Sequence, residues 1–253
     1  MRIALSVMFY LQVPMPESSK FSVGTIVRAP GKLVLAGEYA VLDGAPAISL
    51  AINRGVQCII LSGDEHNKLC QTPTGDSSFV RPALCSIPDP DFYSFSDWNP
   101  VAHLQNKEKP GFGGSAAACV VSCAIAGIPL HQAFQIHHEV QGSGSGIDVA
   151  TSIHGGMIWA ENGNFTQLEP LNPVIIWTGS SAKTGSRVKR YQQWKHRSKF
   201  IQQSIYWTKI FQEDPIQSSR MLYRNLLQMS QESGVEYHNK AIADIVALAE
   251  QYN

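Results

Sequence analysis

The sequence lacks several features that would point directly to a class of partner. Its 253 residues have no net charge, because twenty lysines and arginines balance twenty aspartates and glutamates. This balance argues against general affinity for nucleic acid. No apolar run reaches the roughly 20 residues that a membrane-spanning helix needs. Composition therefore favours neither a nucleic-acid partner nor a membrane.

Cysteine is also scarce. The five cysteines are an odd number and lack the paired spacing of a structural zinc site, which suits a reducing compartment, so we expect a cytoplasmic protein. Cys119 and Cys123 have the spacing of neighbours on one helix face, but they lie in an apolar stretch and are expected to be small buried core residues. With 44% hydrophobic residues, the chain can bury a substantial core.

The first twenty residues resemble a signal peptide in outline, since Arg2 precedes an apolar run. Pro14, Met15 and Pro16 stand where such a peptide would carry small residues at its cleavage site. We therefore expect residues 1–20 to be an N-terminal extension rather than a secretion signal.

The most informative segment is residues 109–117, Lys-Pro-Gly-Phe-Gly-Gly-Ser-Ala-Ala, which leads into an apolar stretch. Glycines let a backbone approach a ligand closely, and the first N–H groups of a helix favour anions. A dinucleotide-binding loop is disfavoured because no buried strand precedes the glycines. A Walker-type loop fails because Ala182 stands where glycine should precede Lys183 and Thr184. The segment predicts a phosphate-binding loop, with an ordinary helix-capping turn as the alternative.

Two further segments carry chemically suggestive residues. In residues 28–42 a Pro-Gly pair divides apolar residues, which predicts strand, turn and strand with Lys32 projecting from the turn. Residues 141–150 form a small-residue loop before a short helix with Asp148 in its first turn. Lys32 has an alternative explanation as a solvated loop charge. Asp148 has one as a favourable charge at a helix N-terminus, worth under about 1 kcal/mol.

Together, and in this order, the three segments resemble the GHMP kinases, the superfamily of galactokinase, homoserine kinase, mevalonate kinase and phosphomevalonate kinase. The first motif is similar to residues 29–32 with the following Gly-Glu-Tyr, and the third to residues 145–148. The second is similar to a Gly-Leu-Gly-Ser-Ser-Ala-Ala loop in which Phe112 and Gly114 are substituted. The Gly-Glu-Tyr-Ala-Val run and a His-x-x-x-Gln-Gly pattern from His137 look nearest to phosphomevalonate kinases. Mevalonate kinases have a magnesium-binding glutamate where His137 stands.

The resemblance implies an α+β protein with a two-domain GHMP-kinase-like fold. It also implies an ATP- and Mg²⁺-dependent phosphotransferase of the mevalonate pathway, which makes isoprenoid precursors. The expected reaction phosphorylates 5-phosphomevalonate to 5-diphosphomevalonate. The alternatives are a mevalonate kinase that acts on the alcohol, or a weakly active nucleotide-binding remnant.

The implied site residues fall into three groups. Lys32 and Asp148 would be catalytic. The ATP phosphates would be bound by a run comprising Pro110, Gly111, Phe112, Gly113, Gly114, Ser115, Ala116 and Ala117, in which Ser115 would also bind Mg²⁺. The acceptor would contact Lys32, Glu38, Tyr39, Ser145, Gly146 and Lys183. Lys183 is included because a phosphate acceptor is mostly dianionic at neutral pH and needs positive charge more than a base.

The order of the expected elements sets the domain limits. Extended segments are predicted at residues 25–28, 32–35, 47–53, 56–62, 157–160 and 168–178. Helices are predicted at residues 114–126, 130–140, 147–153, 187–212, 216–233 and 235–252. We expect an N-terminal GHMP-kinase domain at residues 21–165 and a helix-rich C-terminal domain at residues 166–253. The second domain would be incomplete, since it lacks the family's third glycine-rich motif. An unpaired sheet edge at residues 174–177 would then permit a homodimer.

Overall fold

The computed structural model describes residues 21–62, 69–88, 90–100, 111–178 and 184–251, which form two compact units. The first unit holds the described residues up to Leu33, together with Ser49–Trp159 and Phe165–Pro170. The second holds Val34–Ile48, Ala160–Asn164 and the described residues from Leu171 onward. The expected N-terminal extension at residues 1–20 lies outside the described residues, and the domain limits drawn from the sequence stay a prediction.

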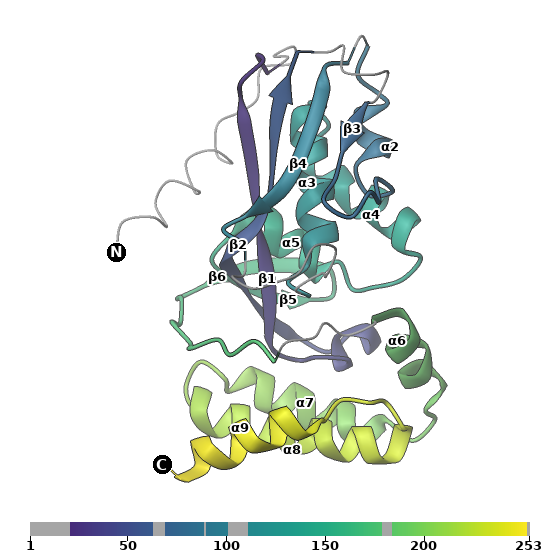
Figure 1. Cartoon of the computed structure of the whole chain (residues 1–253). Coiled ribbons are helices and arrows are strands. Elements are labelled where there is room, and N and C mark those ends of the chain that lie inside the picture. Colours follow the sequence, from purple (N-terminus) through teal and green to yellow (C-terminus); the bar gives the residue numbers. More distant parts are fainter. Residues whose placement is uncertain (1–20, 63–68, 89, 101–110, 179–183, 252–253) are drawn as a thin grey trace. The chain divides into compact units, whose positions relative to one another are not determined.

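Six strands of the described residues form one sheet (Figure 1). Its strand order is β3-β4-β2-β5-β6, and β1 also pairs with β2. Strands β2 and β4 are antiparallel, with Cys58 opposite Phe95, whereas β3 and β4 are parallel. The strands are β1 (Ile26–Ala36), β2 (Ala47–Leu61), β3 (Cys70–Gln71), β4 (Phe92–Trp98), β5 (Met157–Glu161) and β6 (Asn164–Leu168).

Strand β1 runs through Pro30 and Gly31 without a turn, so the predicted strand, turn and strand is wrong. At this point the neighbouring strand β2 carries a glycine, Gly55. A Cβ at Gly55 would lie 2.1 Å from the carbonyl oxygen of Ala29, so only glycine lets β2 pass this close to β1. Strand β2 is likewise continuous from Ala47 to Leu61, where the sequence predicted two separate strands.

The helices of the first unit build its core. They are α2 (Arg81–Leu84), α3 (Gly114–Ile125), α4 (Ala133–Gln141) and α5 (Ile147–His154). Figure 1 shows α3 and α5 against one face of the strands. Cys119 and Cys123 of α3 share a buried cluster with Cys58 and Ile60 of β2, which confirms that these cysteines are core residues. The helices predicted at residues 114–126 and 147–153 are confirmed, whereas α4 begins after a 3-10 turn at Leu130–Gln132.

The second unit is mostly helical. It contains the 3-10 helix η1 (Ala40–Asp43), α6 (Thr184–Gln193), α7 (Ser198–Lys209), α8 (Pro215–Ser233) and α9 (Lys240–Gln251). Tyr191 is fully buried and donates a hydrogen bond of 2.6 Å to Asp43. The guanidinium of Arg197 contacts the same carboxylate at 2.9 Å and donates to the carbonyl of Trp194 at 2.8 Å.

Two helix predictions in this unit are wrong. The single helix predicted at residues 187–212 is broken between α6 and α7, where Arg197 bonds to Asp43 and to the carbonyl of Trp194. The helix predicted from Val235 begins at Lys240 instead. Gly234 ends α8 in a left-handed conformation, and Val235 is buried in the core of the unit.

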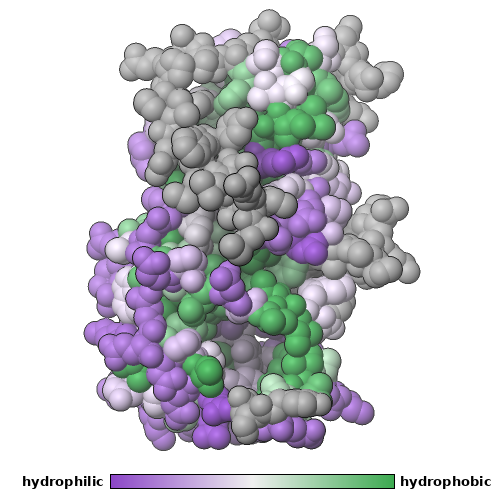
Figure 2. Space-filling model, turned by 90° about the vertical axis from the view of Figure 1, so that its left-hand side faces the viewer, coloured by the Kyte–Doolittle hydropathy of each residue, from purple (hydrophilic) through white to green (hydrophobic). Residues whose placement is uncertain are grey.

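The segment predicted to be extended at residues 168–178 does not form a strand beyond Leu168. Within it, Val174, Ile175 and Ile176 are 90%, 44% and 59% exposed. Figure 2 shows one face of the molecule, on which hydrophobic patches lie among hydrophilic residues. Self-association through this segment stays a prediction.

A helix must be long and apolar to cross the hydrocarbon core of a bilayer. Across the described part of the chain, every helix is too short or too polar to traverse one.

Candidate active site

The glycine-rich loop leads directly into the N-terminus of α3. Gly111 and Gly113 have φ angles of +84° and +73°, which side chains rarely adopt. Gly113 is the N-cap residue, and the N–H of Ala117 donates to its carbonyl at 3.2 Å. Helix geometry leaves the N–H groups of residues 114–116 without an acceptor inside the helix. These three groups, rather than that of Ala117, are the backbone donors suited to a phosphate.

Lys32 lies against this loop. Its backbone N–H donates to the carbonyl of Phe112 at 2.9 Å. A Cβ at Gly113 would lie 3.1 Å from Cγ of Lys32, so the lysine side chain passes directly over the glycine. A Cβ at Gly31 would lie 2.3 Å from the carbonyl oxygen of Phe112. Gly31 and Gly113 therefore allow the loop and β1 to pack this closely.

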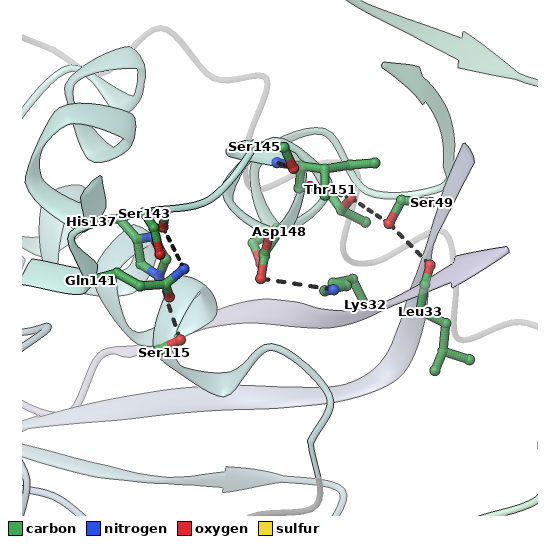
Figure 3. A network of polar contacts seen from close by, with 12 residues as sticks. Lys32, Leu33, Ser49, Ser115, His137, Gln141, Ser143, Ser145, Asp148 and Thr151 are labelled. Atoms are coloured by element: carbon green, nitrogen blue, oxygen red, sulfur yellow. Dashed lines mark hydrogen bonds and ion pairs between the residues drawn. The ribbon is translucent and has the colours of Figure 1, made fainter. Parts of the chain in front are cut away.

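The third motif brings a carboxylate to the same lysine. Asp148 lies in the first turn of α5, and its Oδ2 is 3.8 Å from Nζ of Lys32 (Figure 3). The two side chains are 27% and 19% exposed, so solvent reaches both. Gly146 caps α5 with a φ of +75°, and a Cβ there would lie 3.0 Å from the ring of Phe134. The loop before α5 thus needs glycine both for its backbone conformation and for space.

Ser115, the expected Mg²⁺ ligand, faces an imidazole. Its Oγ is 3.4 Å from Nε2 of His137 on α4, and His137 is 5% exposed. The His137 ring lies beside that of Phe79, with centroids 5.0 Å apart. Burial lowers the pKa of His137, while nearby Asp148 raises it and His138 lowers it. The neutral imidazole is therefore favoured at neutral pH.

A cavity of about 340 Å³ opens beside these groups. Its lining includes His137, Ser143, Ser145, Gly146 and Asp148. Within the described residues no cluster of three His, Cys, Asp or Glu side chains could hold a metal ion. Magnesium commonly uses one or two protein ligands together with phosphate oxygens and water. A magnesium ion at Ser115 would thus depend on a bound phosphate.

The structure brings Lys32, Asp148, Ser145, Gly146 and the loop from Gly111 into one unit, but four predicted residues are not placed with them. Glu38 and Tyr39 lie in the second unit. Pro110 and Lys183 lie outside the described residues.

Tyr39 has an unusual local structure within the second unit. Its φ of +60° is rare for a tyrosine, and strain of this kind is common at functional sites. Burial raises its pKa to about 12, helped by Glu38 and opposed by Arg187. Glu38 lines a small cavity of about 110 Å³ together with Tyr237.

Sequence reasoning missed a group of buried hydroxyls beside the site. Thr151 and Ser152 on α5 and Ser49 on β2 are fully buried and hydrogen-bonded. A signal was available, because Thr151 and Ser152 follow Asp148 at the helical spacings of three and four residues. Their partners on β1 and β2 could not be identified without the register of the strands.

The chain was also compared with known proteins. No protein-family model matches it. It is 24% identical over 199 residues to a phosphomevalonate kinase of Saccharolobus solfataricus, covering 65% of this chain and 61% of that protein. It is 28% identical over 209 residues to a mevalonate kinase of Pyrococcus furiosus, covering 66% and 63%. The chain thus spans about three fifths of the length of these curated relatives.

Solved structures show the same fold. The phosphomevalonate kinase of Streptococcus pneumoniae, solved in complex with phosphomevalonate and AMPPNP, superposes with a TM-score of 0.64 at 16% identity. The match covers 82% of this chain and 81% of that protein. The resemblance inferred from the three motifs is therefore confirmed: the chain is similar in sequence to mevalonate and phosphomevalonate kinases and has the mixed α/β fold of the GHMP kinases.

Proposed function

We propose that the chain carries the phosphoryl-transfer site of a mevalonate-pathway kinase that converts 5-phosphomevalonate to 5-diphosphomevalonate with ATP. The observation that carries this proposal is the position of Lys32, whose side chain passes over Gly113 and whose ammonium is 3.8 Å from Asp148. Lys32 therefore lies between the Asp148 carboxylate and the start of a helix whose first N–H groups are suited to an anion. Phosphoryl transfer needs little more than such positioning and charge neutralisation.

The glycine-rich loop fits the nucleotide phosphates. Gly113 cannot carry a side chain without meeting Lys32, and the N–H groups of residues 114–116 are not used by the helix. These groups would bind the phosphate oxygens, and the Ser115 hydroxyl would be a ligand of Mg²⁺. ATP supplies the phosphoryl group, and the metal reduces the charge on its oxygens.

Lys32 and Asp148 would then have complementary roles. The Lys32 ammonium stabilises negative charge on the phosphoryl group as it moves between oxygens. Asp148 would orient that ammonium, and with an alcohol acceptor it would also accept the hydroxyl proton. A phosphate acceptor has little need of a base, because its second pKa is about 6.

The acceptor is assigned from the pattern of substituted residues. His137 stands where mevalonate kinases have a magnesium-binding glutamate, which favours phosphomevalonate. Ser145 and Gly146 line the cavity beside Asp148 and are proposed to contact the acceptor. Mevalonate is the second candidate, because relatives such as the Pyrococcus furiosus protein are named mevalonate kinases.

The test is an acceptor panel with Mg²⁺ and ATP. ADP release is measured with phosphomevalonate, mevalonate, homoserine and galactose, and each product is identified by its mass. We expect the highest kcat/KM with phosphomevalonate. A preference for mevalonate would move the proposal to its second candidate. Clear binding of Mg-ATP without transfer to any acceptor would contradict the kinase function.

A further inference from the structure

Helix α5 carries two buried hydroxyls on the same face as Asp148. Thr151 and Ser152 follow Asp148 by three and four residues, the spacing at which helix residues are neighbours. Both are fully buried, whereas Asp148 is 27% exposed on its side chain. The helix therefore turns one face towards the sheet, with the carboxylate at the solvent-accessible end of that face.

Both hydroxyls connect α5 to the strand that carries Lys32. Ser152 Oγ donates to the carbonyl of Pro30 at 2.8 Å. Thr151 Oγ1 is 2.8 Å from Oγ of Ser49, which donates to the carbonyl of Leu33 at 3.0 Å (Figure 3). The helix is thus tied to β1 at two carbonyls that lie on either side of Lys32 in the sequence.

The link through Thr151 has fewer hydroxyl protons than short oxygen–oxygen contacts. Thr151 Oγ1 also lies 2.7 Å from the carbonyl oxygen of Ile147, one turn earlier in α5. Three short oxygen–oxygen contacts therefore share two hydroxyl protons, because both end groups are carbonyls, which only accept. If Thr151 donates to Ser49, and Ser49 to Leu33, the contact with Ile147 has no proton of its own. If the Thr151 hydroxyl is removed, Ser49 can still donate its hydrogen bond to Leu33. No buried polar group is then left without a hydrogen-bond partner.

The Lys32–Asp148 contact cannot hold this geometry by itself. Its atoms are 3.8 Å apart and both side chains reach solvent, and ion pairs of this kind contribute little. We propose that Thr151 is a positioning residue, which holds the Asp148 carboxylate at Lys32 by fixing α5 to β1 at Leu33 through Ser49. An effect of this link on the rate of phosphoryl transfer rests on the proposed function. Its effect on the position of Asp148 relative to Lys32 does not.

The experiment uses the full chain and four variants. Thr151→Val removes the hydroxyl with little change of shape, and Thr151→Ser restores it. Ser49→Ala breaks the same link from β2 and serves if Thr151→Val does not fold. Ser122→Ala is the matched control, because Ser122 is equally buried on α3 but donates only to the carbonyl of Cys119 in its own helix. Denaturant unfolding establishes that each variant is folded.

The readout is the acylation rate of Lys32, measured by mass spectrometry against an exposed lysine of the same digest. A loosened pair leaves the ammonium less confined, so Thr151→Val, or Ser49→Ala in its place, should raise this rate several-fold. Thr151→Ser and Ser122→Ala should leave it unchanged. If a folded link-breaking variant labels Lys32 at the wild-type rate, the positioning role is overturned. A rise of the same size in Ser122→Ala would also overturn it.

Activity supplies an independent second readout. A displacement of about 1 Å at a reacting group can cost about 10²-fold in rate. Thr151→Val should therefore lower kcat by about 10- to 100-fold with little change in the KM for ATP. Faster Lys32 labelling in a protein that is inactive with every acceptor would reject the proposed function and retain the positioning role. If the protein is an active kinase and Thr151→Val changes neither kcat nor Lys32 labelling, the positioning role is rejected and the proposed function is retained.

Discussion

The Nζ of Lys32 lies 3.8 Å from Oδ2 of Asp148, although one residue comes from the first strand and the other from a helix far along the chain. The same lysine side chain also passes over Gly113 at the start of α3. Lys32 is thus the residue at which the three sequence motifs meet. Its contact with Asp148 leads to a prediction about the acceptor, and its contact with Gly113 leads to one about the glycine loop.

The role of Asp148 should depend on the acceptor. An alcohol must lose a proton during attack, so Asp148→Asn should lower kcat with mevalonate by about 10² to 10⁴. Phosphomevalonate is mostly dianionic at neutral pH and should lose much less. The measurement is kcat for both acceptors in wild type and variant. If both are phosphorylated and lose rate equally, the distinction between base and orienting partner is wrong.

Gly113 should matter both for its conformation and for its contact with Lys32. Gly113→Ala introduces a side chain at a φ of +73° and 3.1 Å from Lys32 Cγ. We expect a loss of about 1–3 kcal/mol in unfolding free energy from the strained backbone, together with weaker Mg-ATP binding and a lower kcat. Denaturant unfolding and steady-state kinetics measure these effects.

Gly127 offers a matched control for that substitution. Its φ is +67°, and a Cβ there would meet nothing within 4 Å. Gly127→Ala should therefore cost similar stability while leaving Mg-ATP binding and kcat unchanged. Equal kinetic losses in the two variants would show that general destabilisation, rather than the contact with Lys32, explains the effect of Gly113→Ala.

The second unit should lose stability in alkaline solution. Burial raises the pKa of Tyr39 to about 12 and also raises the pKa of Tyr191 and Tyr237. Above pH 10 the unfolded chain releases these protons while the folded chain keeps them. Stability is therefore complete below about pH 10 and falls as the pH rises through the folded-state values.

Tyr237→Phe should reduce that alkaline loss. The measurement is the unfolding free energy at pH 9 and pH 11 for wild type, Tyr237→Phe and Tyr206→Phe, in which the exposed Tyr206 is the control. The fall between the two pH values should be smaller only in Tyr237→Phe. An identical fall in all three proteins would contradict the contribution of Tyr237.

Local sequence signals predicted two of the first unit's helices, α3 and α5, but not α2. The helices at α3 and α5 follow directly from glycine caps and apolar runs. The failures came from contacts between distant residues. Pro30 does not break β1, and beside it Gly55 on β2 lets the two strands approach closely. Arg197 lies at the break between α6 and α7, where it binds Asp43.

The candidate site was predicted in part. The motif order pointed to Lys32, Asp148 and the glycine loop, and the structure brings these groups together, while their roles remain predictions. The buried link from Thr151 through Ser49 was not predictable, because it depends on how α5 packs on two strands. Hydroxyl residues in an apolar helix carry no signal of which carbonyl they will meet.

The most direct test of a phosphoryl-transfer centre at Lys32 is a single-turnover measurement on Lys32→Met with Mg-ATP and phosphomevalonate. Without the ammonium, charge on the moving phosphoryl group is less stabilised, so the transfer rate should fall by about 10² to 10³. Mg-ATP binding, measured by calorimetry on the same sample, should weaken far less, because the helix N–H groups remain. Transfer at the wild-type rate in Lys32→Met would contradict the assignment.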